Sequence, residues 1–167
     1  MYTHLVHPWG PLVSPDCRVL ILGSFPSVKS RAEGFFYGHP RNRFWPMIAA
    51  VCGEERPWSI DEKRELVLRH GIALWDTIGE CDIHASEDAS VRNAVPVDIG
   101  RVLSVARIEQ VLCNGALSGR LYRRHLLPVT GMDCLVMPST SPANAAVPLE
   151  QLIAVWGDAL RGHMRTP

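Results

Sequence analysis

The residues with the clearest chemical potential in this sequence lie in one aromatic and basic segment, GFFYGHPRNRFW. Aromatic faces stack on nucleobases, and arginines pair with phosphates. Phe44 and Trp45 also fit as core anchors of a helix that follows the segment. Phe35, Phe36 and Tyr37 precede that helix, so we expect at least one of these three rings to face a pocket.

Polar side chains also follow four short apolar runs, which read RVLILG, IALWD, QVLCNG and CLVMP. Runs of this length predict buried strands. In open α/β sheets the ligand sits at the carboxyl ends of the strands, so the residues that follow each run should meet at one rim. Four groups are involved: Ser24–Ser27, Asp76–Gly79, Asn114–Gly115 and Ser139–Asn144. They are rich in hydroxyls and amides, which suits hydrogen bonding to a neutral, polar ligand.

Helical patterns separate the predicted strands. Ser59 and Glu62 have capping-box spacing before a helix over 60–70, and Gly71 offers its left-handed end. Further helices are predicted over 42–51, 98–105, 117–126 and 149–160. We expect Pro128 to close the helix over 117–126, the fourth of the five predicted helices. Alternating strands and helices favour an α/β fold: a three-layer α/β/α sandwich around a central, mainly parallel four-stranded sheet.

Composition limits the classes of protein that fit. The 167 residues match one domain, 1–167, and no linker or repeat divides them. Seventeen basic and seventeen acidic residues balance, so any DNA contact must use a local basic patch. Without a signal-like or membrane-spanning stretch, we expect a soluble cytoplasmic protein and a monomer. The five cysteines are an odd number and form no CxxC pair, so we expect no disulfide. Only Cys81 and His84 suggest metal ligands, and no second pair matches them, so we expect no metal and no cofactor.

Residues 23–45, GSFPSVKSRAEGFFYGHPRNRFW, resemble the uracil-DNA glycosylase superfamily. The closest resemblance is to its hypoxanthine-DNA (deoxyinosine) glycosylases, which carry a GSFPS-type first motif and a GHPxNRFW segment. Related mismatch-specific uracil/thymine glycosylases have an asparagine within a GINPG-type first motif, where this chain has Phe25. The resemblance therefore implies that Asn42 takes the catalytic amide role, and that the flipped base stacks on Tyr37.

The resemblance also implies partners for the base. Asn114, which ends VLCNG, matches a base-edge reader in uracil-specific relatives, and an amide can both donate to a carbonyl and accept from a ring N–H. Asn114 could instead be a turn residue before a glycine. Phe25 and Phe36 complete the expected base pocket, and the turn that begins at Ser24 could stabilise the departing base. Asp76 is an alternative general base.

The last predicted loop, MPSTSPANAA, corresponds to the superfamily's second motif, a loop that enters the minor groove. Its hydroxyls and backbone N–H groups could hold phosphates, although the loop could also simply cap the final helix through Asn144. The residues expected to contact DNA are Ser139, Thr140, Ser141, Pro142 and Asn144 of this loop, with Arg41 and Arg43 of the aromatic segment.

Together these features predict a monofunctional glycosylase that extrudes a deaminated base from double-stranded or single-stranded DNA and hydrolyses its N-glycosidic bond. Lys29 and Lys63 are the only lysines, and Lys63 falls on an exposed-looking helix, so a Schiff-base lyase is not expected. Hypoxanthine and uracil both present a carbonyl beside a ring N–H, and the sequence does not separate them. The alternatives are a uracil/mismatch-specific enzyme, another α/β enzyme on the same rim, and a binding module without catalysis.

Overall fold

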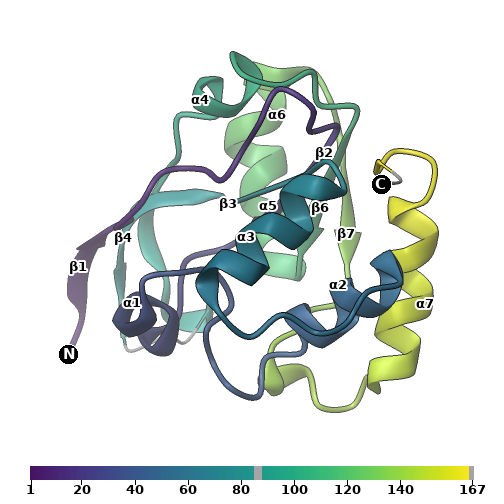
Figure 1. Ribbon diagram of the computed structural model, residues 1–167. Helices are drawn as coiled ribbons and strands as arrows, with labels where there is room; N and C mark the ends of the chain where they lie inside the picture. The colour runs from purple at the N-terminus through teal and green to yellow at the C-terminus, as the bar shows by residue number, and fades with distance from the viewer. Residues whose placement is uncertain (85–87, 166–167) are drawn as a thin grey trace.

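A four-stranded parallel sheet forms the centre of the molecule, and its strands lie in the order β3-β2-β6-β7 (Figure 1). The computed structural model describes residues 1–84 and 88–165. Each strand occupies one of the four predicted apolar runs: β2 (Val19–Gly23), β3 (Ile72–Asp76), β6 (Gln110–Asn114) and β7 (Cys134–Met137). All residues of β2 and β3 are buried, which explains why both strands are continuous apolar runs.

Helices cover both faces of this sheet, which confirms the three-layer α/β/α prediction. In Figure 1 the helix α3 lies in front of the strands and the stretch of α5 and α6 lies behind them, while α2 and α7 pack together at the β7 side. The longer helices are α2 (Phe44–Cys52), α3 (Ile60–Arg69) and α7 (Leu149–Leu160). The short ones are α1 (Val28–Glu33), α4 (Gly100–Leu103), η1 (Asp88–Ser90) and η3 (Pro142–Asn144).

The end signals of α3 act as predicted. The Ser59 hydroxyl accepts the Glu62 N–H at 3.0 Å, the Glu62 carboxylate accepts the Ser59 N–H at 3.0 Å, and Gly71 has φ 73°. The exposed position expected for Lys63 is wrong. Its side chain is buried, pairs with Glu33 at 3.4 Å and lies over the Trp45 ring. The long aliphatic stem makes this burial possible, because it packs on apolar surface while the ammonium finds a partner.

The predicted end of the fourth helix at Pro128 is also wrong. The chain continues from α5 (Ala116–Leu121) through a π-helical turn, η2 (Tyr122–Leu126), into α6 (Leu127–Thr130), and Gly131 ends it at φ 68°. Pro128 stands in the first turn of α6, where a missing N–H costs little. The wider π turn in front of the proline accommodates its ring.

A second, antiparallel sheet joins the main one and is absent from the sequence prediction. It has the order β1-β4-β5, with β1 (Thr3–Val6), β4 (Ile78–Ile83) and β5 (Arg92–Pro96). Thr77 alone separates β4 from β3, and most residues of β1 and β5 are exposed or half-buried. Such strands leave no apolar run in the sequence. The sheet carries the N-terminal segment to the carboxyl end of β3.

The order of the central strands creates a crevice at the carboxyl end of β2. After β2 the chain runs to β3 on one side, and it later returns to place β6 on the other side. Ligands of open α/β sheets bind where the winding reverses in this way. The residues at the ends of β2, β3 and β6 therefore surround the expected binding position.

Candidate active site

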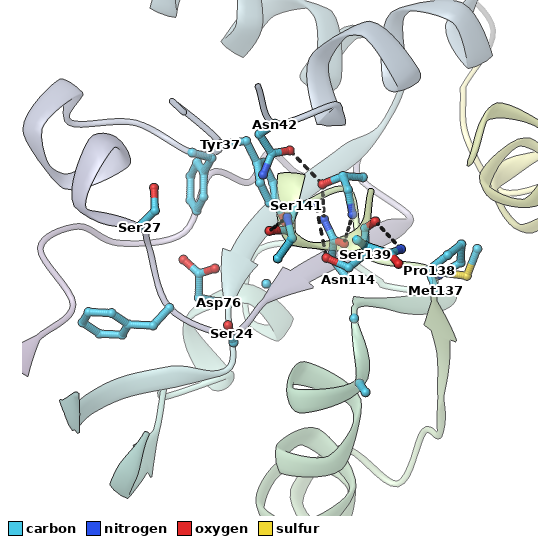
Figure 2. Close-up of a pocket in the computed structure, with 18 of the residues that line it drawn as sticks. Ser24, Ser27, Tyr37, Asn42, Asp76, Asn114, Met137, Pro138, Ser139 and Ser141 are labelled. Atoms are coloured by element: carbon cyan, nitrogen blue, oxygen red, sulfur yellow. Dashed lines mark hydrogen bonds between the residues drawn. The ribbon is translucent and has the colours of Figure 1, made fainter. Parts of the chain in front are cut away.

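A cavity with a volume of about 1020 Å³ lies at this crevice (Figure 2). Its walls come from the ends of all four central strands, the aromatic segment and the loop after β7. Ten of the thirteen predicted site residues line it: Ser24, Phe25, Phe36, Tyr37, Asn42, Asn114, Ser139, Thr140, Ser141 and Asn144. Arg41, Arg43 and Pro142 do not line it. The cavity is large enough to hold a nucleobase.

Asn42 stands just before α2, and its side-chain orientation is fixed by two hydrogen bonds. Its Oδ1 accepts the N–H of Phe44 at 2.9 Å and the hydroxyl of Thr140 at 2.8 Å. A backbone N–H can only donate, so the atom that faces Phe44 must be the oxygen. The Nδ2 amide NH2 is therefore the hydrogen-bond donor that Asn42 presents to the cavity.

Thr140 connects this asparagine to a second one. The Asn114 Oδ1 accepts the Thr140 N–H and the Asn114 Nδ2 donates to the Thr140 hydroxyl, each at 3.0 Å. Thr140 is completely buried, so this chain of hydrogen bonds is shielded from solvent. Asn114 and Asn42 thus face one cavity. Because the Asn114 Oδ1 already accepts the Thr140 N–H, this oxygen binds the protein rather than a base.

The aromatic segment supplies one wall of the cavity. The Tyr37 ring stacks on Phe44, with 4.1 Å between ring centroids and 20° between planes. Tyr37 has φ 53°, a left-handed conformation that costs a residue with a side chain about 1–3 kcal/mol. The indole N–H of Trp45 donates to the Phe36 carbonyl at 3.1 Å and holds the segment in place. The fold thus stabilises a strained tyrosine at the cavity.

The Tyr37 hydroxyl is buried and has no hydrogen-bond partner within the described residues. Burial, and next the negative charge of Asp76, raise the pKa of Tyr37 well above its usual range. The phenol therefore remains protonated at physiological pH. It is a donor beside the side chains of Asp76 and Asn114, both of which line the cavity with Tyr37.

The other predicted pocket residues make narrower contributions. Phe36 is buried and packs edge-on against Trp9, with only part of it lining the cavity. Phe25 is half-buried beside the small apolar cluster of the second sheet, and its ring meets the edge of His7 at 5.7 Å. The carbonyl of Ser24 accepts the Ile78 N–H at 3.0 Å, which ties the turn after β2 to β4.

The loop after β7 is shaped by its own hydroxyls. The Ser139 hydroxyl accepts the Ser141 N–H, and the Ser141 hydroxyl accepts the Ala143 N–H, both at 3.1 Å. Asn144 donates its amide to the Ser139 carbonyl at 3.0 Å, within η3 that begins at Pro142. The N-cap of α7 is Pro148, so the alternative role of Asn144 as that cap is wrong.

The two arginines of the aromatic segment have different surroundings. Arg43 donates to the backbone carbonyls of Ser141, Asn144 and Val147, so it fastens the loop after β7 to the start of α2. These bonds commit much of its guanidinium to the protein. Arg41 is exposed beside the rim and is the arginine of the segment that can reach a phosphate.

Asp76 and His7 form a buried pair that the sequence prediction did not anticipate. The Asp76 Oδ2 lies 2.7 Å from the His7 Nε2, with their side chains 6% and 4% exposed. Asp76 ends β3 and lines the cavity. His7 follows β1, and only the unpredicted second sheet brings it here, so no sequence signal marked it. Asp76 itself was identifiable as the polar end of an apolar run.

Within residues 1–84 and 88–165, no group of three or more histidine, cysteine or acidic side chains could hold a metal ion. All five cysteines are free thiols, and four of them are buried. No described helix has the length and apolar character needed to cross a membrane.

Comparisons with known proteins agree with this geometry. Residues 11–159 match the sequence model of the Uracil DNA glycosylase superfamily. A Hypoxanthine DNA glycosylase of Methanosarcina barkeri is 27% identical over 153 residues, covering 90% of this chain and 95% of the relative. One of Methanosarcina acetivorans is 30% identical over 135 residues, covering 80% of this chain and 84% of the relative.

A solved structure supports the same relationship. The solution NMR structure of a Methanosarcina acetivorans protein, assigned provisionally as a uracil DNA glycosylase, superposes with a TM-score of 0.79 at 25% identity. The superposition covers 92% of this chain and 94% of that one. The sequence match spans all four central strands and the cavity between them, and the chain belongs to the uracil DNA glycosylase superfamily.

Proposed function

We propose that this chain is a monofunctional DNA glycosylase that releases hypoxanthine from deoxyinosine in DNA, as the first step of base excision repair. The two Methanosarcina relatives are named for hypoxanthine, and this chain has Phe25 where the mismatch-specific uracil/thymine enzymes have an asparagine. Its substrate is DNA that contains a deaminated base. We further propose that it acts as a monomer in the cytoplasm.

The observation that carries this proposal is the hydrogen-bonded connection of Asn42 to Asn114 through Thr140 at one cavity. Two amides from segments far apart in sequence are held rigidly beside the aromatic wall. This arrangement suits a flipped base, which needs a stacking surface and fixed polar partners. We expect the hydroxyl-rich loop that contains Thr140, which lines the same cavity, to contact the DNA backbone.

The chemistry assigned to these residues is hydrolysis. The bond between C1′ of the sugar and N9 of hypoxanthine breaks, its electron pair leaves with the base, and the sugar acquires oxocarbenium character. A water oxygen then bonds to C1′, and its proton passes to the departing base or to solvent. Asn42 offers an N–H rather than an oxygen, so it holds this water or the leaving base as a donor.

The surroundings of Lys63 support hydrolysis over lyase chemistry. Lys63 is buried in its pair with Glu33, away from the residues that line the cavity. A Schiff-base nucleophile would have to reach C1′ in its neutral form. We therefore expect an intact abasic strand as the product.

The test uses end-labelled duplexes with one deoxyinosine or one deoxyuridine, followed by alkaline cleavage of abasic sites. We expect product from deoxyinosine with the unaltered protein, and a single-turnover rate about 10²–10³-fold lower with Asn42→Ala, as for loss of one preorganised donor. Binding without any abasic product would overturn the enzymatic proposal. Full activity of Asn42→Ala would overturn only the role of that residue, and product from deoxyuridine alone would move the substrate to uracil.

A further inference from the structure

The His7–Asp76 pair has a fixed arrangement of protons. The backbone N–H of Trp9 donates to the His7 Nδ1 at 3.2 Å, so this nitrogen is an acceptor. The ring proton must then be on Nε2, which donates it to the Asp76 Oδ2 at 2.7 Å. This tautomer makes His7 a neutral donor and leaves Asp76 as the charged acceptor. Aromatic edges of Trp9, Phe25 and Trp75 surround the imidazole and prevent its rotation.

The second carboxylate oxygen of Asp76 faces the cavity. Among the described residues no donor lies within hydrogen-bonding distance of Oδ1. Gly23 leaves the space for it, because a Cβ at this position would overlap Oδ1 and would lie 3.2 Å from the Tyr37 hydroxyl. Figure 2 shows the carboxylate projecting between Ser24 and Tyr37. The Asp76 carboxylate, whose other oxygen pairs with His7, and the buried Tyr37 hydroxyl, which has no hydrogen-bond partner among the described residues, therefore line one cavity.

Buried polar atoms without partners are costly, and a ligand that supplies the partners recovers that cost. The ligand must offer an N–H to Asp76 and a neighbouring acceptor to Tyr37. A cyclic amide, –C(=O)–NH–, has this pair of groups. Deamination creates it, because hypoxanthine has N1–H beside C6=O where adenine has a bare N1 beside an amino group.

We propose that Asp76 and Tyr37 read the amide edge of the flipped base, with the Asp76 Oδ1 accepting the ring N–H and the Tyr37 hydroxyl donating to the carbonyl. His7 is the positioning residue, because its bond to Oδ2 keeps Oδ1 turned into the cavity. The inference rests on the proposed function and extends it. Because the base stays bonded to its sugar, its orientation in the cavity is fixed and N1 always lies against Asp76. Adenine would therefore place its N1 lone pair against the carboxylate. Adenine is therefore rejected by repulsion.

His7 lies outside the part of the chain that matches the superfamily, which begins at residue 11. It reaches Asp76 because β1 pairs with β4 and the His7 N–H donates to the Gly79 carbonyl at 2.7 Å. The same two strands hold a second histidine–carboxylate pair, His4 and Asp82, at 2.8 Å and partly exposed. Asp82 does not line the cavity, and it supplies a matched control.

The decisive experiment compares the binding of duplexes that carry 2′-fluoro-deoxyinosine or 2′-fluoro-deoxyadenosine, whose glycosidic bonds resist cleavage. The unaltered protein should prefer the inosine duplex. Asp76→Asn should reduce this preference by about 10–100-fold, because its amide can turn an N–H toward the adenine N1. Asp82→Asn should keep the preference of the unaltered protein. Equal binding of both duplexes by the unaltered protein, or an unchanged preference in Asp76→Asn, would overturn the inference.

His7 is tested by a conservative pair of variants with the same two duplexes. His7→Ala should lose most of the preference for inosine, and His7→Gln should restore much of it, because a glutamine amide can donate to Oδ2. Equal loss in both variants, with unchanged melting temperatures, would remove the positioning role. Since binding of uncleavable duplexes is measured, these results are independent of catalysis. Absence of hypoxanthine release from ordinary deoxyinosine would instead count against the proposed function.

Discussion

At the scale of single residues, the cavity is lined by polar groups whose conformation or missing hydrogen bonds lower the stability of the folded chain. Tyr37 combines a left-handed backbone with a buried hydroxyl that has no partner in the described protein. Asp76 has one oxygen for which the described residues supply no hydrogen-bond donor. Strain and missing hydrogen bonds gather at functional sites because a ligand or transition state completes them. Removal of the Tyr37 hydroxyl should therefore raise the stability of the folded chain and weaken the binding of the base.

Tyr37→Phe tests this opposition. Removal of the hydroxyl relieves a buried polar group whose cost is about 1–3 kcal/mol, so the melting temperature should rise by roughly 2–12 °C. Stacking on Phe44 is retained, while base binding should weaken about tenfold because the donor is lost. Calorimetry and duplex-binding titrations measure the two effects. A lower melting temperature would show that the hydroxyl has a stabilising partner, contrary to this account.

Several site residues were predictable because their position in the chain revealed their position in the fold. Asn114 ends the largely buried strand β6, and Asn42 stands before a helix in a characteristic motif. The residues after Met137 follow β7, an apolar edge strand whose Leu135 and Val136 are exposed, so the expectation that this strand is buried is wrong. The hydrogen bonds that Thr140 makes to both asparagines were not predictable, since they depend on how two loops approach each other. His7 was not predictable either, because its strand is mostly exposed and has no apolar pattern.

At the scale of elements, the contacts that fix the helices lie away from the cavity. The start of α3 has its capping box, and its end is joined to the segment after α2 through Glu54, which accepts from Arg69 and contacts His70. The bond from Arg69, then that from His70, holds the pKa of Glu54 below its usual value of 4.5. Glu54 therefore stabilises the fold above that value, and the contribution disappears as the pH falls through the lower pKa of the folded chain.

Glu54→Gln should show this dependence on pH. At pH 7 the variant should melt about 2–4 °C below the unaltered protein, because the charged hydrogen bonds are lost. Near pH 3 the difference should shrink, since the carboxylate of the unaltered protein is then increasingly protonated. Asp158→Asn is the control, because Asp158 pairs with Arg161 on an exposed surface. A constant difference at both pH values would contradict the assigned ionisation.

The central strands and main helices were accessible from sequence because the strands are apolar runs, of which β2 and β3 are buried along their whole length. The three strands of the second sheet were not, since they are short and largely half-buried or exposed. The continuation of the chain past Pro128 depended on a π turn, which local propensity does not specify. Local sequence patterns thus predict the layers of the fold, whereas the second sheet and the helix past Pro128 depend on tertiary contacts.

At the scale of the whole molecule, the balanced charge limits how the protein can hold DNA. With seventeen basic and seventeen acidic residues, binding cannot depend on a broadly positive surface. Arg43 is largely engaged in fastening the loop after β7, which leaves Arg41 as the exposed arginine of the aromatic segment. Few phosphate contacts should give a modest salt dependence, with recognition concentrated in the cavity.

Arg41→Ala tests this view of DNA binding. The variant should weaken binding to damaged and undamaged duplexes alike, and should reduce the slope of log K against log salt by about 1, as expected for one lost phosphate contact. The preference for deoxyinosine should stay the same. Binding titrations at several salt concentrations measure both quantities, and a selective loss for the damaged duplex would place Arg41 at the base instead.

The central claim is that this cavity releases hypoxanthine by hydrolysis. The most direct measurement is chromatography of the products after incubation of the unaltered protein with a deoxyinosine duplex, combined with gel analysis of the strand. The account predicts free hypoxanthine, together with an unbroken strand that breaks only on alkaline treatment. Absence of the free base, or strand breakage without alkali, would contradict it.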